Sequence, residues 1–423
     1  MKKQASSKSY LIIGLIFLFI GVATLIGKVP LFKSVANLVL IFMILKSIKE
    51  LFSFILTKPV KDIKLFNKMF NVVISIIALI FKDYSIAIVP ILFSAYSILN
   101  ALIKIINYIL LKENNVSDRF RELFLGIIYL FIGFIILLGP LVHLKFVLNV
   151  LGIYSTLLGT SFIFDYLEIN NYFKLLKIKV CLPSIVEVFI PIQVLQRINK
   201  AMNNDEEVLL EHRKENKTPD LEIFIHVTKD GYGTLGHIDI FYNHEILSYG
   251  NYDISSYKFH DGIGRGVLFK VKDKEKYIKF CIEDNKKTLF AFGLSLNEKE
   301  KEKINKNIEK IKAELKEWDC PYKKALKVGK KAKKEDYMDY SSRLYRATKA
   351  KFYKFKSGKF KSFCVIGNNC VSFANKIIGN ALNDSFKLYG VLTPGTYYEY
   401  LEREFMKKNS IVCSKKIYTK SSN

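Results

Sequence analysis

The chain of 423 residues is half hydrophobic and carries a formal net charge of +26. Both parts are basic, because residues 1–165 hold 17 Lys and Arg against 7 Asp and Glu, and residues 166–423 hold 48 against 32. The sequence lacks a recognition-helix, zinc-finger or RNA-binding signature, which argues against a nucleic-acid partner. It also lacks a metal-ligand pattern and a Gly-rich phosphate loop, so we expect no cofactor.

Apolar runs long enough to cross a bilayer fill residues 1–165. Three of them, 10–27, 123–142 and 146–164, are strong candidates for transmembrane helices. The runs 34–57, 69–81 and 84–111 are shorter or contain lysine, and a soluble amphipathic helix is the alternative for each. No small-residue cleavage site follows residue 27, so the first run is expected to be a span rather than a signal peptide. We therefore predict an all-α membrane bundle of about six transmembrane helices.

An internal repeat divides this bundle. The segment from Gly14 to Gly21 recurs as Gly126 to Gly133 with six of eight residues identical. The offset of 112 residues fits three hairpins of about 56 residues each. Glycine in such helices lets their backbones approach closely. In its repeat, hydropathy and glycine placement, the segment resembles the HdeD-like family of small bacterial acid-resistance membrane proteins.

Charge in the loops predicts the orientation of the bundle. With six spans, the loops on one side hold 13 Lys and Arg, and those on the other side hold only Lys28, Lys33, Lys82 and Lys145. The side richer in positive charge is cytoplasmic. All six cysteines follow residue 165 with no C-x-x-C pair, which fits a reducing compartment. We expect a multi-pass protein of the bacterial inner membrane with a cytoplasmic soluble domain.

The soluble part is predicted to begin after a connector, 166–207, which is expected to lie on the membrane surface. Residues 208–423 then form an α+β domain with a Lys- and Tyr-rich insertion at 323–361, interpreted as a surface loop with short helices against the bilayer; a flexible linker is the alternative. A charged helix is expected at 296–318. Alternating apolar patterns and turn residues predict strands at 221–228, 237–242, 245–249, 267–271, 277–282 and 288–294.

A candidate nucleophile lies at the start of a helix near the C-terminus. Cys370, Phe373, Ala374, Ile377 and Ile378 share one helical face, and Asn368 or Asn369 would cap the helix. At such a position the helix dipole favours a reactive thiolate. From the helix alone, simple packing of a small buried residue is the alternative.

A candidate base lies far upstream, where Gly236 and His237 begin a predicted strand. A nucleophilic cysteine needs a base within hydrogen-bonding reach and a third group that orients this base. The next strand ends with polar residues, which could supply the third group. His226 is a rival for the base.

The Gly-His strand followed by an Asn-Cys helix is similar to circularly permuted papain-like hydrolases related to NlpC-type peptidases and lecithin:retinol acyltransferase. The resemblance spans residues 221–405. It implies Cys370 as the nucleophile, His237 as the base and Tyr249 as the orienting residue. His, Asn or Gln is usual at the third position, so Asn251 or Ser248 is the alternative there.

These features predict a membrane-anchored thiol hydrolase or acyltransferase that acts on amide, ester or thioester bonds. The basic surface predicts contact with anionic lipid headgroups, which favours a lipid or lipid-linked substrate over a peptide or isopeptide. A non-catalytic membrane stress or scaffold protein with a binding domain is the alternative from another class.

Overall fold

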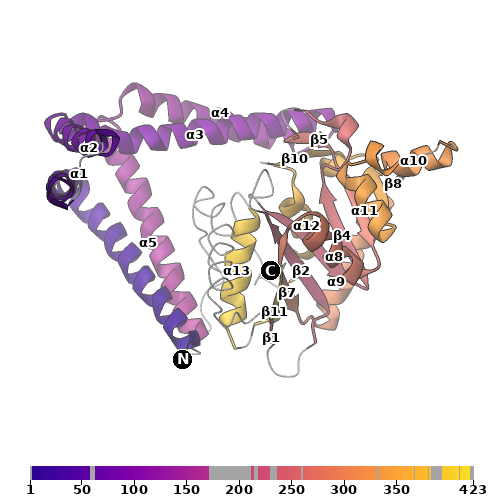
Figure 1. Ribbon diagram of the computed structural model, residues 1–423. Coiled ribbons are helices and arrows are strands. Elements are labelled where there is room, and N and C mark those ends of the chain that lie inside the picture. The colour runs from indigo at the N-terminus through magenta and orange to yellow at the C-terminus, as the bar shows by residue number, and fades with distance from the viewer. Residues whose placement is uncertain are drawn as a thin grey trace. The chain divides into compact units, whose positions relative to one another are not determined.

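The computed structural model describes residues 2–57, 62–170, 211–213, 218–228, 236–258, 261–330, 333–365, 367–379, 381–382, 393–408 and 410–419 (Figure 1). They form two compact units, one of residues 8–106 and 120–163, the other comprising 164–423 together with 1–7 and 107–119. Most of the predicted connector, from 171 to 207, lies outside the described residues, as does Cys181.

The first unit is helical. It contains all of α2 (Asp62–Ile80) and most of α1 (Lys2–Thr57), α3 (Lys82–Glu113), α4 (Arg119–Leu138) and α5 (Leu144–Ile169). The first element is two helices joined at a kink, because Lys28 has φ 46° and Pro30 follows it. Among the described residues, four helices are long and apolar enough to cross a membrane, and α2 contributes a shorter apolar stretch, Met69–Ile80.

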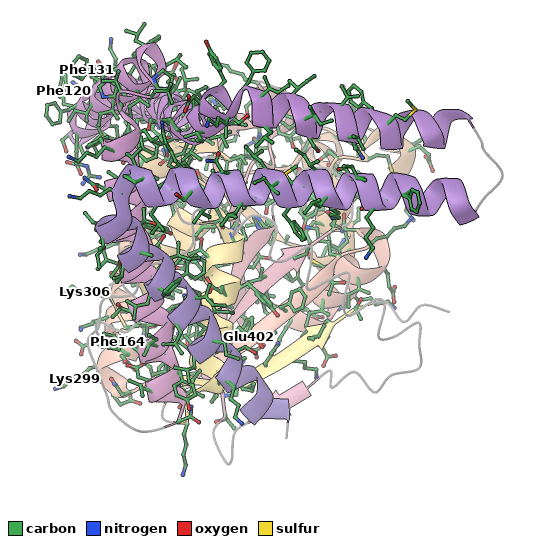
Figure 2. The ribbon with its side chains drawn as sticks, turned by 90° about the vertical axis from the view of Figure 1, so that its left-hand side faces the viewer. Phe120, Phe131, Phe164, Lys299, Lys306 and Glu402 are labelled. Atoms are coloured by element: carbon green, nitrogen blue, oxygen red, sulfur yellow. The ribbon has the colours of Figure 1, made fainter. Side chains whose placement is uncertain are left out.

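Large apolar side chains cover the outside of these helices. Phe120 and Phe131 of α4, labelled in Figure 2, are 60% and 65% exposed. Exposing so much apolar surface to water is unfavourable, whereas lipid hydrocarbon solvates it as well as a protein core does. The first unit is therefore built for a lipid environment.

Glycine brings two pairs of these helices into close contact. A methyl group on Gly21 of α1 would lie 2.4 Å from the Thr156 hydroxyl of α5, and one on Gly14 would lie 3.0 Å from the Gly159 carbonyl oxygen. On α4, Gly133 lies against α3, where the Ser94 hydroxyl donates to its carbonyl at 2.7 Å. Both copies of the sequence repeat thus place their glycines at helix–helix contacts.

This packing predicts the effect of adding one methyl group. Gly21→Ala should lower the stability of the helical unit by about 1–3 kcal/mol, because Thr156 and its backbone must move to make room. Gly139→Ala is the matched control, since its nearest neighbour would be at 3.5 Å, an ordinary contact. Thermal unfolding of the detergent-solubilised protein measures both. Equal melting temperatures for the two variants would contradict the close approach of α1 and α5.

The second unit is built on one antiparallel sheet of nine strands in the order β1-β11-β7-β2-β3-β4-β6-β9-β8. The strands are β1 (Glu211–Arg213), β2 (Leu221–Val227), β3 (His237–Tyr242), β4 (Glu245–Gly250), β6 (Val267–Val271), β7 (Thr288–Leu294), β8 (Leu315–Trp318), β9 (Lys351–Phe355) and β11 (Val412–Tyr418). A separate pair joins β5 (Ile263–Arg265) and β10 (Ser362–Cys364).

Helices cover both faces of this sheet. One core contains residues of α9 (Glu298–Ala313), α12 (Cys370–Ile378) and α13 (Pro394–Met406). The other contains residues of α8 (Lys274–Lys279), the π-helical turn η3 (Phe280–Asp284) and α11 (Tyr340–Thr348). Shorter elements are η2 (Ile254–Ser256), α10 (Pro321–Lys327), η4 (Lys334–Asp336) and η5 (Lys359–Lys361). The domain is thus an antiparallel sheet with helices, as the α+β prediction requires at this coarse level.

Two predicted elements were wrong. The strand expected at 277–282 is helical, because Asp273 caps α8 by accepting from the Lys276 amide and its apolar residues face the sheet as a helix. The helix expected at 296–318 ends at Ala313, and its last residues form β8, which pairs with β9. Part of the Lys- and Tyr-rich insertion also belongs to the main sheet, because Lys351–Phe355 forms β9, which pairs with β6 and β8.

Candidate active site

Cys370 is the first residue of α12. Asn369 caps this helix: its side chain accepts from the Ser372 amide at 3.0 Å, and the Ser372 hydroxyl accepts from the Asn369 amide at 3.1 Å. This reciprocal cap fixes where the helix begins. The apolar face of α12, with Phe373 and Ile377, packs on β3 and β4. The sequence therefore determines both the helix start and the face that meets the sheet.

His237 is the first residue of β3, and the residue before it must be glycine. Gly236 has φ +84°, and a methyl group on it would lie 2.8 Å from Pro394 at the start of α13. The chain consequently enters β3 tightly against α13, with the imidazole at the start of the strand. There the His237 ring lies near enough to the Cys370 thiol for the sulfur to help raise the pKa of the imidazole.

Three polar groups surround one nitrogen of the His237 ring. Its Nε2 atom lies 2.9 Å from the Ser248 hydroxyl, 3.1 Å from the Tyr252 hydroxyl and 2.9 Å from Oδ1 of Asp239. Ser248 and Tyr252 also bond each other at 2.8 Å. These contacts fix the plane of the His237 ring.

Asp239 is shared by two histidines. Its fully buried carboxylate lies 2.6 Å from Nε2 of His226 on β2 and 2.9 Å from Nε2 of His237, and it also accepts from the Tyr277 hydroxyl. His226 and His237 are directly opposite in the pairing of β2 with β3, and Asp239 lies two residues further along β3. The strand period of two therefore puts all three side chains on one face.

Burial and charge set the ionisation of this cluster. Burial disfavours the charged form of His237, but the neighbouring Cys370 and Asp239 outweigh this effect and raise the pKa of His237 to about 10. Burial lowers the pKa of His226 to about 4, against the pull of Asp239. Burial also disfavours the Asp239 carboxylate, yet the two imidazoles hold the pKa of Asp239 well below its ordinary value. These effects favour the charged form of His237, the neutral form of His226 and the ionised form of Asp239.

Of the three residues predicted for the third position, only Ser248 contacts His237, and Tyr249 and Asn251 bond elsewhere. Tyr249, the first choice, donates to the carbonyl oxygens of Phe360 and Ser362 at 3.1 Å, and its ring stacks on Phe373 of α12. Asn251 donates to the Asp261 carbonyl at 3.0 Å. Ser248, the other alternative, does contact His237.

Sequence reasoning missed Asp239 and Tyr252. The signal for Asp239 was present, because an acidic residue two positions after a strand histidine shares its face. An acid within an otherwise apolar strand is also unusual unless it is paired.

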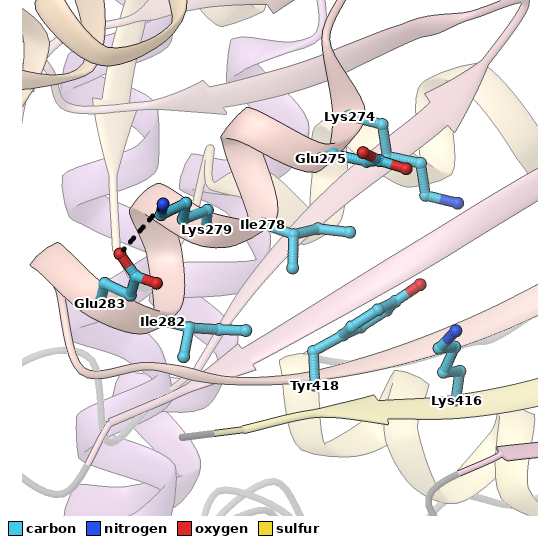
Figure 3. Close-up of a pocket in the computed structure, with 8 residues that line it drawn as sticks. All are labelled: Lys274, Glu275, Ile278, Lys279, Ile282, Glu283, Lys416 and Tyr418. Carbon is cyan, nitrogen blue, oxygen red and sulfur yellow. Dashed lines mark ion pairs between the residues drawn. The ribbon is translucent and has the colours of Figure 1, made fainter. Parts of the chain in front are cut away.

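One hollow on the described surface lies away from this cluster. It has a volume of about 420 Å³ and runs between the α8–η3 segment and β11, where Ile278, Ile282 and Tyr418 line it (Figure 3). Charged side chains surround it, and Lys279 and Glu283 approach each other at 3.9 Å. None of the residues around Cys370 and His237 lines this hollow, so it is separate from the candidate active site.

The described residues comprise an apolar helical segment with four membrane-capable helices, followed by an antiparallel-sheet domain that carries both Cys370 and His237. A family model described as a short repeat of unknown function, DUF308, matches residues 69–138. The match covers most of α2, all of α3 and α4, and agrees with the resemblance to HdeD-like membrane proteins. No curated protein and no solved structure matches the chain.

Selective alkylation tests the reactivity of Cys370. Iodoacetamide near neutral pH should modify Cys370 first, because it adjoins an imidazolium and begins a helix. The other described cysteines are more deeply buried, and burial raises the pKa of Cys281 to about 12 and also raises that of Cys320. Mass spectrometry of the folded protein gives the rate at each site. Equal rates at all cysteines would reduce Cys370 to a packing residue.

The charge on His237 can be followed directly. In protein labelled with ¹⁵N-histidine, the ring of His237 should stay protonated through pH 8 and lose its proton near the pKa of about 10. Because Cys370 contributes to raising this pKa, Cys370→Ala should lower it, while Cys320→Ala should leave it unchanged. A His237 ring that titrates near 6.5 in the parent protein would exclude the charged cluster.

Proposed function

We propose that residues 208–423 form a circularly permuted papain-like thiol hydrolase or acyltransferase. The observation that carries the proposal is the proximity of the Cys370 thiol to the His237 imidazole, whose pKa it helps to raise although the two residues lie 133 positions apart in the sequence. A nucleophile at a helix start, a base on a strand and polar groups behind the base are the parts that covalent catalysis requires. Asp239, with Ser248 and Tyr252, takes the orienting role that the sequence suggested for Tyr249.

Acyl transfer would proceed in two halves. The Cys370 thiolate attacks the carbonyl carbon of an amide, ester or thioester, and the carbonyl electron pair moves to oxygen. When this intermediate collapses, the leaving amine, alcohol or thiol takes the proton of His237, and a thioester to Cys370 remains. Water or an acceptor hydroxyl then gives a proton to His237 while attacking the thioester, which releases the thiolate. The first half thus removes the proton from His237, and the second half returns it.

Backbone amides at the start of α12 are placed to stabilise the oxyanion. The first amides of an α-helix have no partner within the helix. The cap occupies the Ser372 amide, which leaves those of Cys370 and Val371 for a developing negative charge beside the sulfur.

The substrate we propose is a lipid or lipid-linked acyl compound at the cytoplasmic face of the membrane. Support comes from the apolar helices that would hold the domain beside acyl lipids and from the net positive charge of residues 166–423. A peptide or isopeptide is the second candidate.

Acylation of the protein tests the chemistry. With short-chain p-nitrophenyl esters, mass spectrometry should find one acyl group on Cys370. Cys370→Ala should abolish the adduct, and His237→Ala should slow its formation by about 10²–10⁴-fold. Asp239→Asn should slow it less and move the pH profile to lower pH, because the variant removes a charge that raises the pKa of His237.

Cys320→Ala, which alters a buried cysteine outside the cluster, is the control and should acylate at the parent rate. If no ester acylated Cys370, and if His237→Ala left the alkylation rate of Cys370 unchanged, the results would favour the binding or scaffold alternative.

For the membrane segment we propose six passes in three hairpins, with both termini in the cytoplasm. The kink at Lys28 divides α1 into two apolar helices, and α2 to α5 supply the other four. The charge bias of 13 to 4 between the two sets of loops sets the orientation.

Reporter fusions test this orientation. A fluorescent protein fused after Asn423 should be bright, and alkaline phosphatase at the same place should be inactive. Fusions after Lys82 should show the reverse, since that loop would face the exterior. An active phosphatase after Asn423 would overturn both the orientation and the cytoplasmic substrate.

A further inference from the structure

We infer that the segment from Pro321 to Met338, here called the α10 tip, is a membrane-contact element that inserts apolar side chains among anionic lipid headgroups. This inference concerns a surface remote in sequence from Cys370 and does not depend on catalysis. The α10 tip comprises α10, the following turn and η4, and Figure 1 shows α10 projecting from the sheet domain near β8.

Exposed apolar side chains gather in this segment. Among the described residues from 211 onward, four large hydrophobic side chains are exposed, namely Ile254, Leu326, Val328 and Met338. Three of the four belong to the α10 tip, where Val328 is 69% exposed and Met338 is 62% exposed. Val328 and Gly329 form the turn after α10, and a methyl group on Gly329 would meet no atom within 4 Å. The turn is therefore open to an external partner.

Positive charge surrounds these apolar residues. The α10 tip contains seven lysines against Glu335 and Asp336. Asp319 pairs with Lys323 and Lys327, each at 2.6 Å. The exposed lysines after the turn and at the start of η4 include Lys330, Lys333 and Lys334. Apolar side chains flanked by lysines match a headgroup layer, in which hydrocarbon and negative charge lie within a few ångströms of each other.

The base of the α10 tip is ordered rather than a loose linker. Tyr322 contacts Tyr337 at 5.6 Å between ring centroids, which brings the two ends of the segment together. Arg346 of α11 lies over the Tyr322 ring at 5.1 Å and donates to the Tyr337 carbonyl at 2.8 Å. Ala325 is buried and anchors α10. An element held at its base and exposed at its turn can enter an interface without unfolding the domain.

The partner we infer for the α10 tip is a bilayer, because the same chain carries membrane-capable helices. Four of its described helices are membrane-capable, so the covalent link keeps the domain at a high effective concentration beside lipid. A weak contact that would not hold a free protein can then be occupied. Lysine and apolar groups together also favour anionic over zwitterionic headgroups.

Depth-dependent quenching tests the inference in the full chain. The protein carrying Val328→Trp is placed in nanodiscs of phosphatidylcholine with one third phosphatidylglycerol, with or without bromine on the acyl chains. Bromine should quench the added indole by about half, as expected for a residue at the acyl boundary. Trp318 is the only native tryptophan, so the signal of the parent protein is subtracted.

Lys306→Trp on α9 is the matched control, because Lys306 is also exposed but lies on a helix without exposed large apolar residues among those described (Figure 2). It should not be quenched. Adding Lys330→Glu, Lys333→Glu and Lys334→Glu to Val328→Trp should abolish the quenching, as should discs of phosphatidylcholine alone. An added indole at 328 with equal fluorescence in brominated and plain discs, or equal quenching of both tryptophan variants, would overturn the inference.

Discussion

The buried charge of Asp239 is the constraint around which the sheet domain is arranged. An ionised carboxylate without water is strongly disfavoured unless charges or hydrogen bonds surround it. Here His226 from β2, His237 from its own strand and Tyr277 from α8 all reach it. Those partners meet only in the observed register of β2 and β3, since a slip by one residue would turn the side chains to opposite faces. The carboxylate thus links the register of the strands to the ionisation of His237.

The sulfur meets this charged cluster because α12 is held on the sheet by aromatic packing. Tyr249 is fully buried, stacks on Phe373 and donates to two carbonyl oxygens just before β10 and within it. It therefore fixes the helix that carries Cys370, while Asp239 fixes the ring of His237. Tyr249 and Asp239 act from different layers of the domain. Either residue can therefore be altered without removing the other.

Sequence patterns predicted the local elements of the site better than its polar network. The cap at Asn369 and the strand from His237 to Tyr242 follow from short-range rules, and both are observed. The role of Asp239 depends on which strands become neighbours, which short-range patterns do not state. The short β8 was merged with the charged helix before it for the same reason, because residues 315–318 become a strand only through pairing with β9. The membrane repeat was visible because it is a property of the sequence itself.

In the helical unit, the same repeat explains which helices touch. The first part of α1 packs on α5 and α4 packs on α3, each through a glycine of the repeated segment. The middle copy lacks these glycines, and there α2 meets the second part of α1 through the hydroxyls of Ser47 and Ser75, 3.4 Å apart. In all three contacts, the first helix of one hairpin meets the second helix of another. Phe32 and Ala36 also meet Leu144 and Leu148, their counterparts 112 residues later, in one cluster with Ile86 of α3. Equivalent positions converging on one cluster are what a repeat produces when its copies close on one another, so the loss of glycine in the middle copy alters one contact without changing the arrangement.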